Sequence, residues 1–388
     1  MQKWLLPEYI EDILPAEARR IETLRRRLLD LFEAHGYELV MPPLVEYVDS
    51  LLTGTGHDLD LRTFKLVDQL SGRMLGLRAD ITPQVARIDA HLLNRRGVAR
   101  LCYAGSVLHT LPSGLLRTRE PIQIGAELYG HAGVESDIEI QTLMLRALGA
   151  AGASGLHLDL GHVAVFRTIV RRAGIDAQRE GDLFQVLQAK DRPGLEALTA
   201  SLDATTRRAL LLLPELYGGA EVIAAARQHL PAYPELASSL DALEAIGAVV
   251  GGEVAELCFD LAELRGYHYH SGMVFAAYAP GRNDAIARGG RYDEVGGAFG
   301  RPRPATGFSI DLRDLAELAG DGAVPRRVLA PYLPGDGVLQ AEIERLRAAG
   351  TVVIVELPGH VDARDELGCQ WELARRGGRW EMTARPPR

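Results

Sequence analysis

Residues 103–130 have the sequence YAGSVLHTLPSGLLRTREPIQIGAELYG, and this stretch decides the predicted fold. Apolar runs stand at both of its ends, and residues 112–114 contribute a proline and a glycine between them. Because Pro and Gly favour turns, the stretch predicts two strands that are joined by a loop. Gln123 and Glu127 are four residues apart on the second strand, so both side chains should point to the same face. They are candidates for the recognition of a small molecule.

The segments before this stretch predict a helix, a short strand, a hairpin and a second helix. Residues 15–36 place apolar side chains at helical spacing. Residues 37–47 have strand character that two consecutive prolines interrupt, so this strand should end there or lie at a sheet edge. Residues 63–82 predict the hairpin. Residues 82–94 predict the second helix, with Thr82 as its N-cap.

The segments after the stretch change character twice. Residues 134–150 predict a helix and residues 156–162 a strand, whereas the Ala- and Leu-rich residues 163–250 predict a helical insertion. Further segments are predicted as strands at residues 256–260, 272–278 and 305–310, a helix at residues 313–320, and a strand–helix–strand unit after about residue 324. The last residues are polar and rich in Arg, and no element is predicted for them.

An antiparallel sheet flanked by helices and interrupted by a helical insertion is an α+β arrangement. We expect residues 1–162 to form the first part of the core and residues 163–250 the insertion. We expect residues 251–320 to complete the core and residues 321–388 to form a short C-terminal α/β tail.

Composition and charge exclude several classes of protein. The 388 residues are 47% hydrophobic and 24% charged, which is typical of a soluble globular protein. The net charge of −9 argues against a nucleic-acid partner, and no apolar run approaches the about 20 residues of a membrane span. Cys102, Cys258 and Cys369 have no metal-ligand spacing, so we predict no metal site and no disulfides. Three scattered cysteines fit a reducing compartment, and we therefore predict a cytoplasmic location.

The order of the segments resembles class II aminoacyl-tRNA synthetases over residues 8–320, and specifically histidyl-tRNA synthetases. The motifs that carry the resemblance are GYELVMPPLVEY, LRADITPQVAR, IQIGAELYG, LRGYHYHSGMVF, RGGRYDEV and ATGFSIDLRDL. Each is short, but six in the family's order make a specific match. The first resembles motif 1, which lies at the family's dimer interface and so implies self-association as a dimer. RGGRYDEV resembles a turn of the family.

The resemblance implies a site that binds free histidine. Asp80 and Thr82 match the positions that hold the amino group. Gln123 and Glu127 match the family's recognition strand, where Glu127 would accept an imidazole N–H in a charge-assisted hydrogen bond. Arg265 matches the arginine that meets the carboxylate. Taken singly, each of these positions also fits an ordinary structural role. Asp80 and Thr82 could cap a helix, Gln123 and Glu127 could belong to a half-exposed strand face, and Arg265 could be a surface charge.

Two further positions belong to the implied site. Tyr269 matches the first of the family's paired tyrosines, and His270 replaces the second, which touches the imidazole. His268 and His270 flank Tyr269, but no Cys or acidic residue stands at a matching spacing, so no metal or other cofactor is predicted.

The sequence departs from the family where ATP would bind. His109 and Leu111 stand where motif 2 has its arginine and glutamate. Asp314 stands at the motif 3 arginine, with Arg313 one residue away, and Asp311 replaces a small residue near the nucleotide. Because aspartate repels a triphosphate, adenylate formation is not expected.

Two arginines of the motif 2 loop, Arg117 and Arg119, remain and could bind an anion or face solvent. The tail after Val324 is shorter than the anticodon-binding domain of histidyl-tRNA synthetases and looks truncated or degenerate.

A histidine site without the ATP-binding cations resembles the family of ATP phosphoribosyltransferase regulatory subunits of histidine biosynthesis. The resemblance implies a non-catalytic chain that activates a short-form catalytic subunit in a hetero-octamer, with histidine as a feedback effector. Two alternatives remain open. One is an active histidyl-tRNA synthetase, and the other is a synthetase paralogue that binds or modifies another protein.

Overall fold

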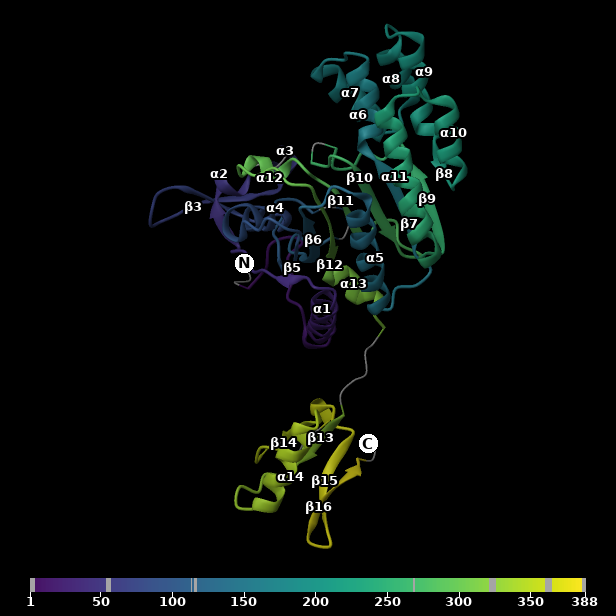
Figure 1. Ribbon diagram of the computed structural model, residues 1–388. Helices are drawn as coiled ribbons and strands as arrows, with labels where there is room; N and C mark the ends of the chain where they lie inside the picture. The colour runs from purple at the N-terminus through teal and green to yellow at the C-terminus, as the bar shows by residue number, and fades with distance from the viewer. Residues whose placement is uncertain are drawn as a thin grey trace. The chain divides into compact units, whose positions relative to one another are not determined.

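The computed structural model describes residues 4–53, 57–112, 114, 117–267, 269–320, 326–359 and 365–385. The chain divides into two compact units, Met1–Gly320 and Asp321–Arg388, which Figure 1 shows in its colour order. None of the helices described in these ranges is long and apolar enough to cross a membrane.

The larger unit is built on a sheet in which nine strands are found among the described residues. Their order across the sheet is β1 (Glu38–Leu39), β5 (Ala99–Ser106), β6 (Ile122–Tyr129), β12 (Ala305–Asp311), β11 (Ala287–Arg291), β10 (Met273–Tyr278), β7 (His157–His162), β9 (Glu256–Asp260) and β8 (Tyr217–Gly218). Neighbours are antiparallel except for the parallel pairs β1–β5 and β7–β9. The predicted α+β class is confirmed, and the strand before the two prolines lies at the sheet edge as expected.

One face of the sheet is covered by helices α1 (Pro15–Ala34), α5 (Val134–Ala150) and α13 (Leu312–Leu318), which lie side by side in Figure 1. Helix α1 buries Leu28 and Phe32 completely, and the Phe32 ring meets the Phe308 ring of β12 edge-on at 5.8 Å. The sequence predicted the two long helices, α1 and α5, because each buries one face and its apolar residues therefore repeat with the helical period. The opposite face of the sheet carries the cavities described below.

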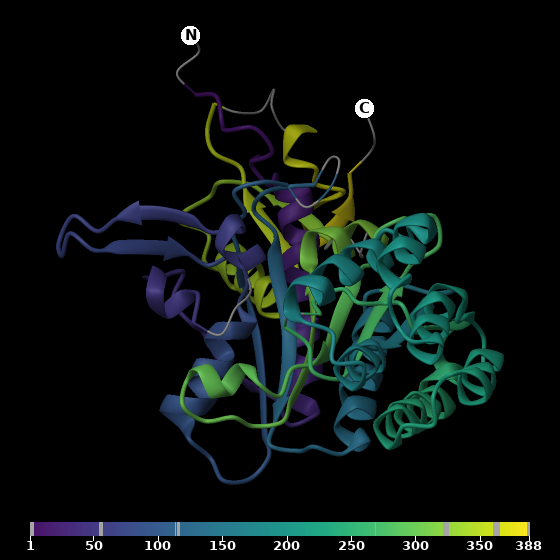
Figure 2. The ribbon, with the colours of Figure 1, turned by 90° about the horizontal axis from the view of Figure 1, so that it is seen from above.

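A second sheet of the larger unit has the order β2 (Val45–Tyr47), β4 (Met74–Leu77) and β3 (Phe64–Val67). The predicted hairpin is confirmed as β3–β4, and it projects from the body of the unit in Figure 2. The short helices beside the two sheets are α2 (Val48–Leu51), α3 (His57–Arg62), α4 (Thr82–Arg87), the π-helix η1 (Ile88–Leu93) and α12 (Val295–Ala298).

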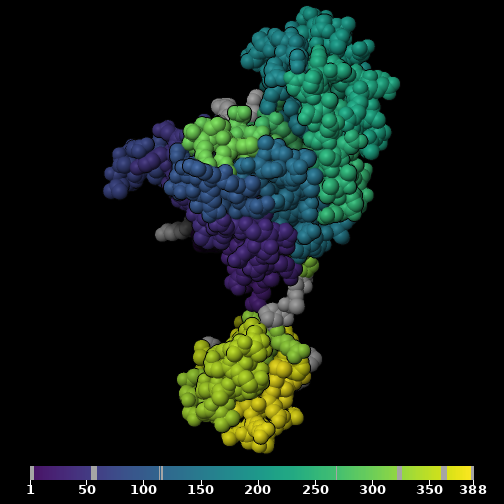
Figure 3. Space-filling model, viewed as in Figure 1, coloured from purple at the N-terminus to yellow at the C-terminus, as the bar shows by residue number. Residues whose placement is uncertain are grey.

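The residues predicted as an insertion form a lobe of helices, and in Figure 3 this lobe stands out from the rest of the larger unit. Its helices are α6 (Val163–Arg172), α7 (Ala177–Gln188), α8 (Arg192–Thr199), α9 (Ala204–Leu212), α10 (Glu221–His229) and α11 (Pro234–Val250), with the 3₁₀ turns η2 (Leu213–Glu215) and η3 (Gly251–Glu253). Strand β8 also comes from this segment and pairs with β9, so the lobe is joined to the sheet.

The prediction of a turn at RGGRYDEV, which came from the family resemblance, is wrong. The first four residues of this motif lie in the central strand β11. Glycines in this strand present no side chains and so produce no alternation of polarity. They are needed because the strands pack closely. A Cβ atom at Gly289 would come within 2.2 Å of the Gly307 carbonyl oxygen and 2.4 Å of the Phe275 ring.

The smaller unit has a sheet in the order β14 (Val352–Val355), β13 (Arg327–Ala330), β15 (Trp371–Arg376) and β16 (Arg379–Ala384), with helix α14 (Gly337–Ala348) against it. The strand–helix–strand prediction is confirmed. The expectation that the following polar residues form no element is wrong, because they form the antiparallel hairpin β15–β16. Leu373 is buried in this hairpin, and the Trp380 indole N–H donates to Asp336 at 3.1 Å. Charged residues on the exposed side obscure the alternation in the sequence.

Candidate functional site

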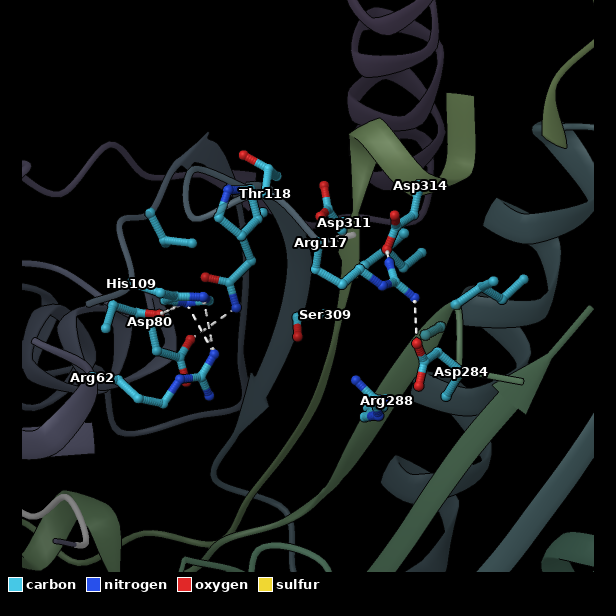
Figure 4. A pocket seen from close by; sticks show the side chains of 18 of the residues that line it. Arg62, Asp80, His109, Arg117, Thr118, Asp284, Arg288, Ser309, Asp311 and Asp314 are labelled. Carbon is cyan, nitrogen blue, oxygen red and sulfur yellow. Dashed lines mark hydrogen bonds and ion pairs between the residues drawn. The ribbon is translucent and has the colours of Figure 1, made fainter. Parts of the chain in front are cut away.

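The open face of the main sheet contains a cavity of about 270 Å³, to which strands β6, β11 and β12 contribute residues (Figure 4). Its polar lining consists of Arg62, Asp80, His109, Arg117, Thr118, Gln123, Asp284, Arg288, Ser309, Asp311 and Asp314. The cavity therefore brings together two predicted histidine-site residues and the positions at which the family would bind ATP.

Asp80 and Gln123 both line this cavity and are joined by a hydrogen bond. Asp80 Oδ1 accepts hydrogen bonds from Gln123 Nε2 at 2.8 Å and from the Thr82 backbone N–H at 3.1 Å. Gln123 Oε1 accepts the Ile81 N–H at 2.9 Å. The prediction of Thr82 as an N-cap is wrong, because Thr82 is the first helical residue and the capping position is Ile81. The Thr82 hydroxyl is engaged elsewhere.

Glu127 is the centre of a fully buried polar cluster. Its Oε1 accepts hydrogen bonds from the Thr82 hydroxyl at 3.0 Å and the Tyr103 hydroxyl at 3.1 Å, and its Oε2 accepts one from Tyr292. Burial raises the pKa of Glu127 to about 8, against the opposing effect of the hydrogen bonds from Tyr292 and Thr82. The Glu127 carboxyl group lies over Gly307, where a Cβ atom would come within 1.6 Å of Oε2.

Tyr103 and Tyr292 were not assigned to the site from the sequence. Tyr103 is the first residue of the stretch 103–130, and it lies opposite Gly125 on β6. Tyr292 follows the arginine of RGGRYDEV. The close approach of Tyr103 to a glycine two residues before Glu127 is a tertiary feature that strand periodicity does not contain.

Tyr269 and His270 lie beside this cluster. The Tyr269 ring stacks on the Tyr292 ring with centroids 5.1 Å apart, and the His270 ring meets Tyr269 edge-on at 5.4 Å. Burial lowers the pKa of His270 to about 4, so its imidazole is neutral. Within the described part of the chain, the buried Tyr269 hydroxyl and His270 Nδ1 have no hydrogen-bond partner. His268, which was weighed as a metal ligand, lies outside the described residues.

Arg265 is separated from the other predicted site residues. Its side chain is 52% exposed and forms an ion pair with Glu263, at 3.1 Å between Nε and Oε2. Together with His270 it lines a smaller cavity of about 150 Å³, whereas Asp80 and Gln123 line the larger one. The structure therefore does not place Arg265 against the groups expected to hold the amino end of the ligand.

His109 supplies no positive charge where motif 2 would have its arginine. Its Nε2 lies 2.9 Å from the Ala79 carbonyl oxygen, and both ring nitrogens lie 3.1 Å from Arg62 Nη2. Burial, together with the adjacent Arg62 cation, lowers the pKa of His109. The ring is therefore neutral at pH 7. Leu111, at the motif 2 glutamate, is 70% exposed.

Asp314 neutralises the arginine that remains in the motif 2 loop. Arg117 forms ion pairs with Asp314 and with Asp284, at 3.2 Å in the second pair, as Figure 4 shows. Arg313 does not line the cavity, because it is buried and donates to Glu11 at 2.5 Å. At the motif 2 and motif 3 positions, a triphosphate would meet a neutral imidazole, an aspartate and an arginine that is already paired.

Among the described residues, one group could hold a metal ion, namely His157, Asp159 and Cys258, whose ligand atoms lie within 4.8 Å of one another. Parallel pairing of β7 and β9 brings them together, which sequence spacing does not reveal. His157 already contacts Asp159 at 2.6 Å and Glu256 at 3.0 Å, so these side chains satisfy one another as they stand.

Comparison with protein-family models matches residues 9–315 to histidyl-tRNA synthetase and residues 325–383 to the ATP phosphoribosyltransferase subunit HisZ C-terminal domain. The second match corrects the expectation of a truncated or degenerate tail, since the smaller unit corresponds to a domain of its own. Two curated relatives carry the name ATP phosphoribosyltransferase regulatory subunit. The protein of Nitrosospira multiformis is 59% identical over 98% of both chains, and that of Ralstonia nicotianae is 59% identical over 99% of both.

Solved structures agree. A crystal structure described as an ATP phosphoribosyltransferase regulatory subunit/histidyl-tRNA synthetase from Bacillus halodurans has a TM-score of 0.82 and 27% identity, and covers 94% of this chain and 96% of its own. Histidyl-tRNA synthetase from Nostoc shares the fold, with a TM-score of 0.77, 19% identity and coverage of 99% of this chain and 97% of its own. The names of the relatives favour the regulatory subunit over the synthetase. The chain belongs to the family of ATP phosphoribosyltransferase regulatory subunits, which is built on the histidyl-tRNA synthetase fold.

Proposed function

We propose that this chain is a non-catalytic subunit that activates a short-form ATP phosphoribosyltransferase in the cytoplasm, in a hetero-octamer. The observation that carries the non-catalytic part is the inverted charge of the nucleotide positions. Asp314 stands where the family has an arginine and pairs with Arg117, and His109 is neutral. Phosphoryl chemistry depends on cations that stabilise developing negative charge. The curated relatives support the regulatory part through their name.

Histidine is the proposed effector, and the site is formed by Asp80, Thr82, Gln123, Glu127, Tyr269 and His270, with Arg265 as the arginine that the family resemblance adds. The contacts of Asp80 with Gln123 and of Thr82 with Glu127 hold four of these side chains in one place. The buried Tyr269 hydroxyl has no hydrogen-bond partner among the described residues, which supports the proposal because buried polar atoms normally have partners.

The proposed regulation is linkage between two states of the complex. Histidine binds one state more tightly and therefore shifts the population towards it. Coupling of this kind is typically about 1 to 3 kcal/mol and is reciprocal, so substrate binding on the catalytic subunit should weaken histidine binding here.

The direct test mixes the purified chain with a short-form catalytic subunit and measures phosphoribosyl transfer with and without histidine. We expect activity only in the mixture, and we expect histidine to inhibit it.

Thr82→Val should weaken inhibition by histidine roughly 10-fold. The substitution keeps the volume of the side chain but leaves Glu127 with one hydrogen bond fewer. Activity of the catalytic subunit that is independent of the chain would contradict the proposal.

An active histidyl-tRNA synthetase remains the alternative from another class. It requires histidine-dependent exchange between ATP and pyrophosphate by the chain alone. We expect no exchange above background, because the cavity contains no unpaired cation at the motif 2 or motif 3 position among the described residues. The second alternative, a paralogue that acts on another protein, predicts no co-purification with the phosphoribosyltransferase.

We also propose that the motif 1 region joins two copies of the chain. Leu39 on the edge strand β1, Met41 and Leu44 are exposed at 46%, 76% and 45%. Clustered exposed apolar side chains commonly mark an interface. The occupant is a second copy, since motif 1 forms the dimer interface of the family that this chain resembles.

The dimer is tested by Met41→Asp. Burying an unpaired charge at an interface costs several kcal/mol, so we expect the variant to sediment as a monomer at concentrations where the wild type is dimeric. Leu357→Asp is the matched control, because Leu357 is also exposed, at 60%, but lies in the smaller unit. Equal sedimentation of all three proteins would contradict the proposal.

A further inference from the structure

Arg288 projects from the same face of the main sheet as the predicted histidine-site residues. It lies on β11 directly opposite Ser309 on β12, and Ser309 lies opposite Gly125 on β6. Directly opposite residues of antiparallel strands present their side chains to the same face. Gly125 lies two residues from both Gln123 and Glu127 along β6, so all of these positions share one face.

Arg288 lines both cavities of this face. It lines the larger cavity together with Asp80 and Gln123 and the smaller one together with Arg265 and His270. Among the residues that the structure describes, it is the one residue that the two cavities have in common. A small molecule that extends from Asp80 towards His270 therefore passes the Arg288 side chain.

Arg288 is also the cation that is left without a partner. Arg62, Arg117 and Arg265 each pair with a neighbouring side chain, as described above. No hydrogen bond or ion pair joins the Arg288 guanidinium to any other described residue, and no dashed line reaches it in Figure 4. Its pKa is lowered, first by burial and then by the nearby Arg265 cation. The charges of Asp284 and Tyr278 oppose this effect, and part of the Arg288 side chain is exposed to solvent.

We propose that Arg288 binds the carboxylate of the amino-acid effector, in place of Arg265. The inference rests on the proposed histidine site and names the residue that holds the anionic end of the ligand. A zwitterionic amino acid needs an anion and a cation in one cavity, and the larger cavity offers Asp80 and Arg288. An arginine binds a carboxylate through two parallel, charge-assisted hydrogen bonds. Arg265 would first have to leave Glu263.

The experiment compares two ligands that differ at the carboxylate. L-Histidine and L-histidinol share the imidazole and the ammonium group, but histidinol carries a hydroxymethyl group in place of the carboxylate. Both are titrated by calorimetry into the full-length wild type and into Arg288→Met and Arg265→Met. Inorganic pyrophosphate is titrated into the same three proteins.

We expect Arg288→Met to weaken histidine binding by about 10- to 100-fold, which is the usual effect of removing a hydrogen-bond partner of a charged group, and to leave histidinol binding unchanged. Arg265→Met should affect neither ligand by more than about 3-fold, because an exposed ion pair contributes little. If the wild type binds no histidine at all, the proposed site itself fails.

Three other results overturn the assignment of Arg288 alone. The first is a loss of histidine affinity in Arg265→Met with none in Arg288→Met. The second is an equal loss of histidine and histidinol affinity in Arg288→Met, which indicates a general disturbance of the site. The third is pyrophosphate binding that depends on Arg288 while histidine binding does not, which identifies a phosphate site.

Discussion

Replacing Arg291 by methionine should lower the free energy of unfolding of the larger unit by about 3 to 5 kcal/mol, because it leaves a buried carboxylate without its partner. Arg291 Nε and Nη2 donate to Asp137 Oδ2 at 3.0 and 2.9 Å, and the two side chains are only 9% and 6% exposed. Nη2 also donates to Ser136 at 2.8 Å. The bonds join the end of β11 to helix α5, which covers the other face of the sheet.

The matched control is Arg288→Met, three residues earlier on the same strand. It removes an arginine that has no partner among the described residues, so its unfolding free energy should change by less than about 1 kcal/mol. Calorimetry is the suitable measurement, because the two compact units can unfold in separate transitions. Equal melting temperatures for the two variants would show that the pair with Asp137 does not stabilise the unit.

Replacing Glu127 by glutamine should remove a large part of the pH dependence of stability. The carboxyl group has a pKa of about 8 in the folded chain, against 4.5 for an unperturbed glutamate. The folded state therefore holds a proton that the unfolded state has released between these two values. A raised pKa gives stability that is complete below the unfolded pKa and is lost as the pH rises through the folded pKa.

The difference in stability between wild type and Glu127→Gln should therefore fall with rising pH, by about 1.4 kcal/mol per unit, from near pH 4.5 to near pH 8. Over the whole window this amounts to roughly 5 kcal/mol. Urea unfolding of both proteins at several pH values measures it, and subtraction cancels the other titrating groups. A difference that does not change with pH would mean that Glu127 is ionised in the folded chain throughout.

Elements with one buried face were predictable from the sequence, and elements without that asymmetry were not. The helix predicted at residues 134–150 has the bounds of α5, because its apolar side chains repeat with the helical period. Strand β11 has glycines where side chains would alternate, and β16 carries charged residues on its exposed side. Both were therefore missed.

For the candidate site, strand geometry was enough to relate Gln123 to Glu127, because the two residues are on one strand. The contact between Thr82 and Glu127 joins residues 45 positions apart, and only the motif order indicated it. The orientation of the Arg265 side chain depends on its ion pair with Glu263, two residues away. The family motif assigns Arg265 by position alone and does not include the charge of Glu263. Arg288 was quoted within a motif and not assigned, since an unpaired charge is recognised only when every neighbour is known.

The ion pair between Arg117 and Asp314 makes a synthetase-like nucleotide site hard to obtain by single mutational steps. Restoring an arginine at position 314 would place two guanidinium groups side by side and would leave Arg117 with Asp284 alone. Position 109 would still be neutral, so this first step would destabilise the chain without conferring nucleotide binding. Each of these substitutions depends on the others, so no single one of them is expected to give the cavity a set of cations for a nucleotide.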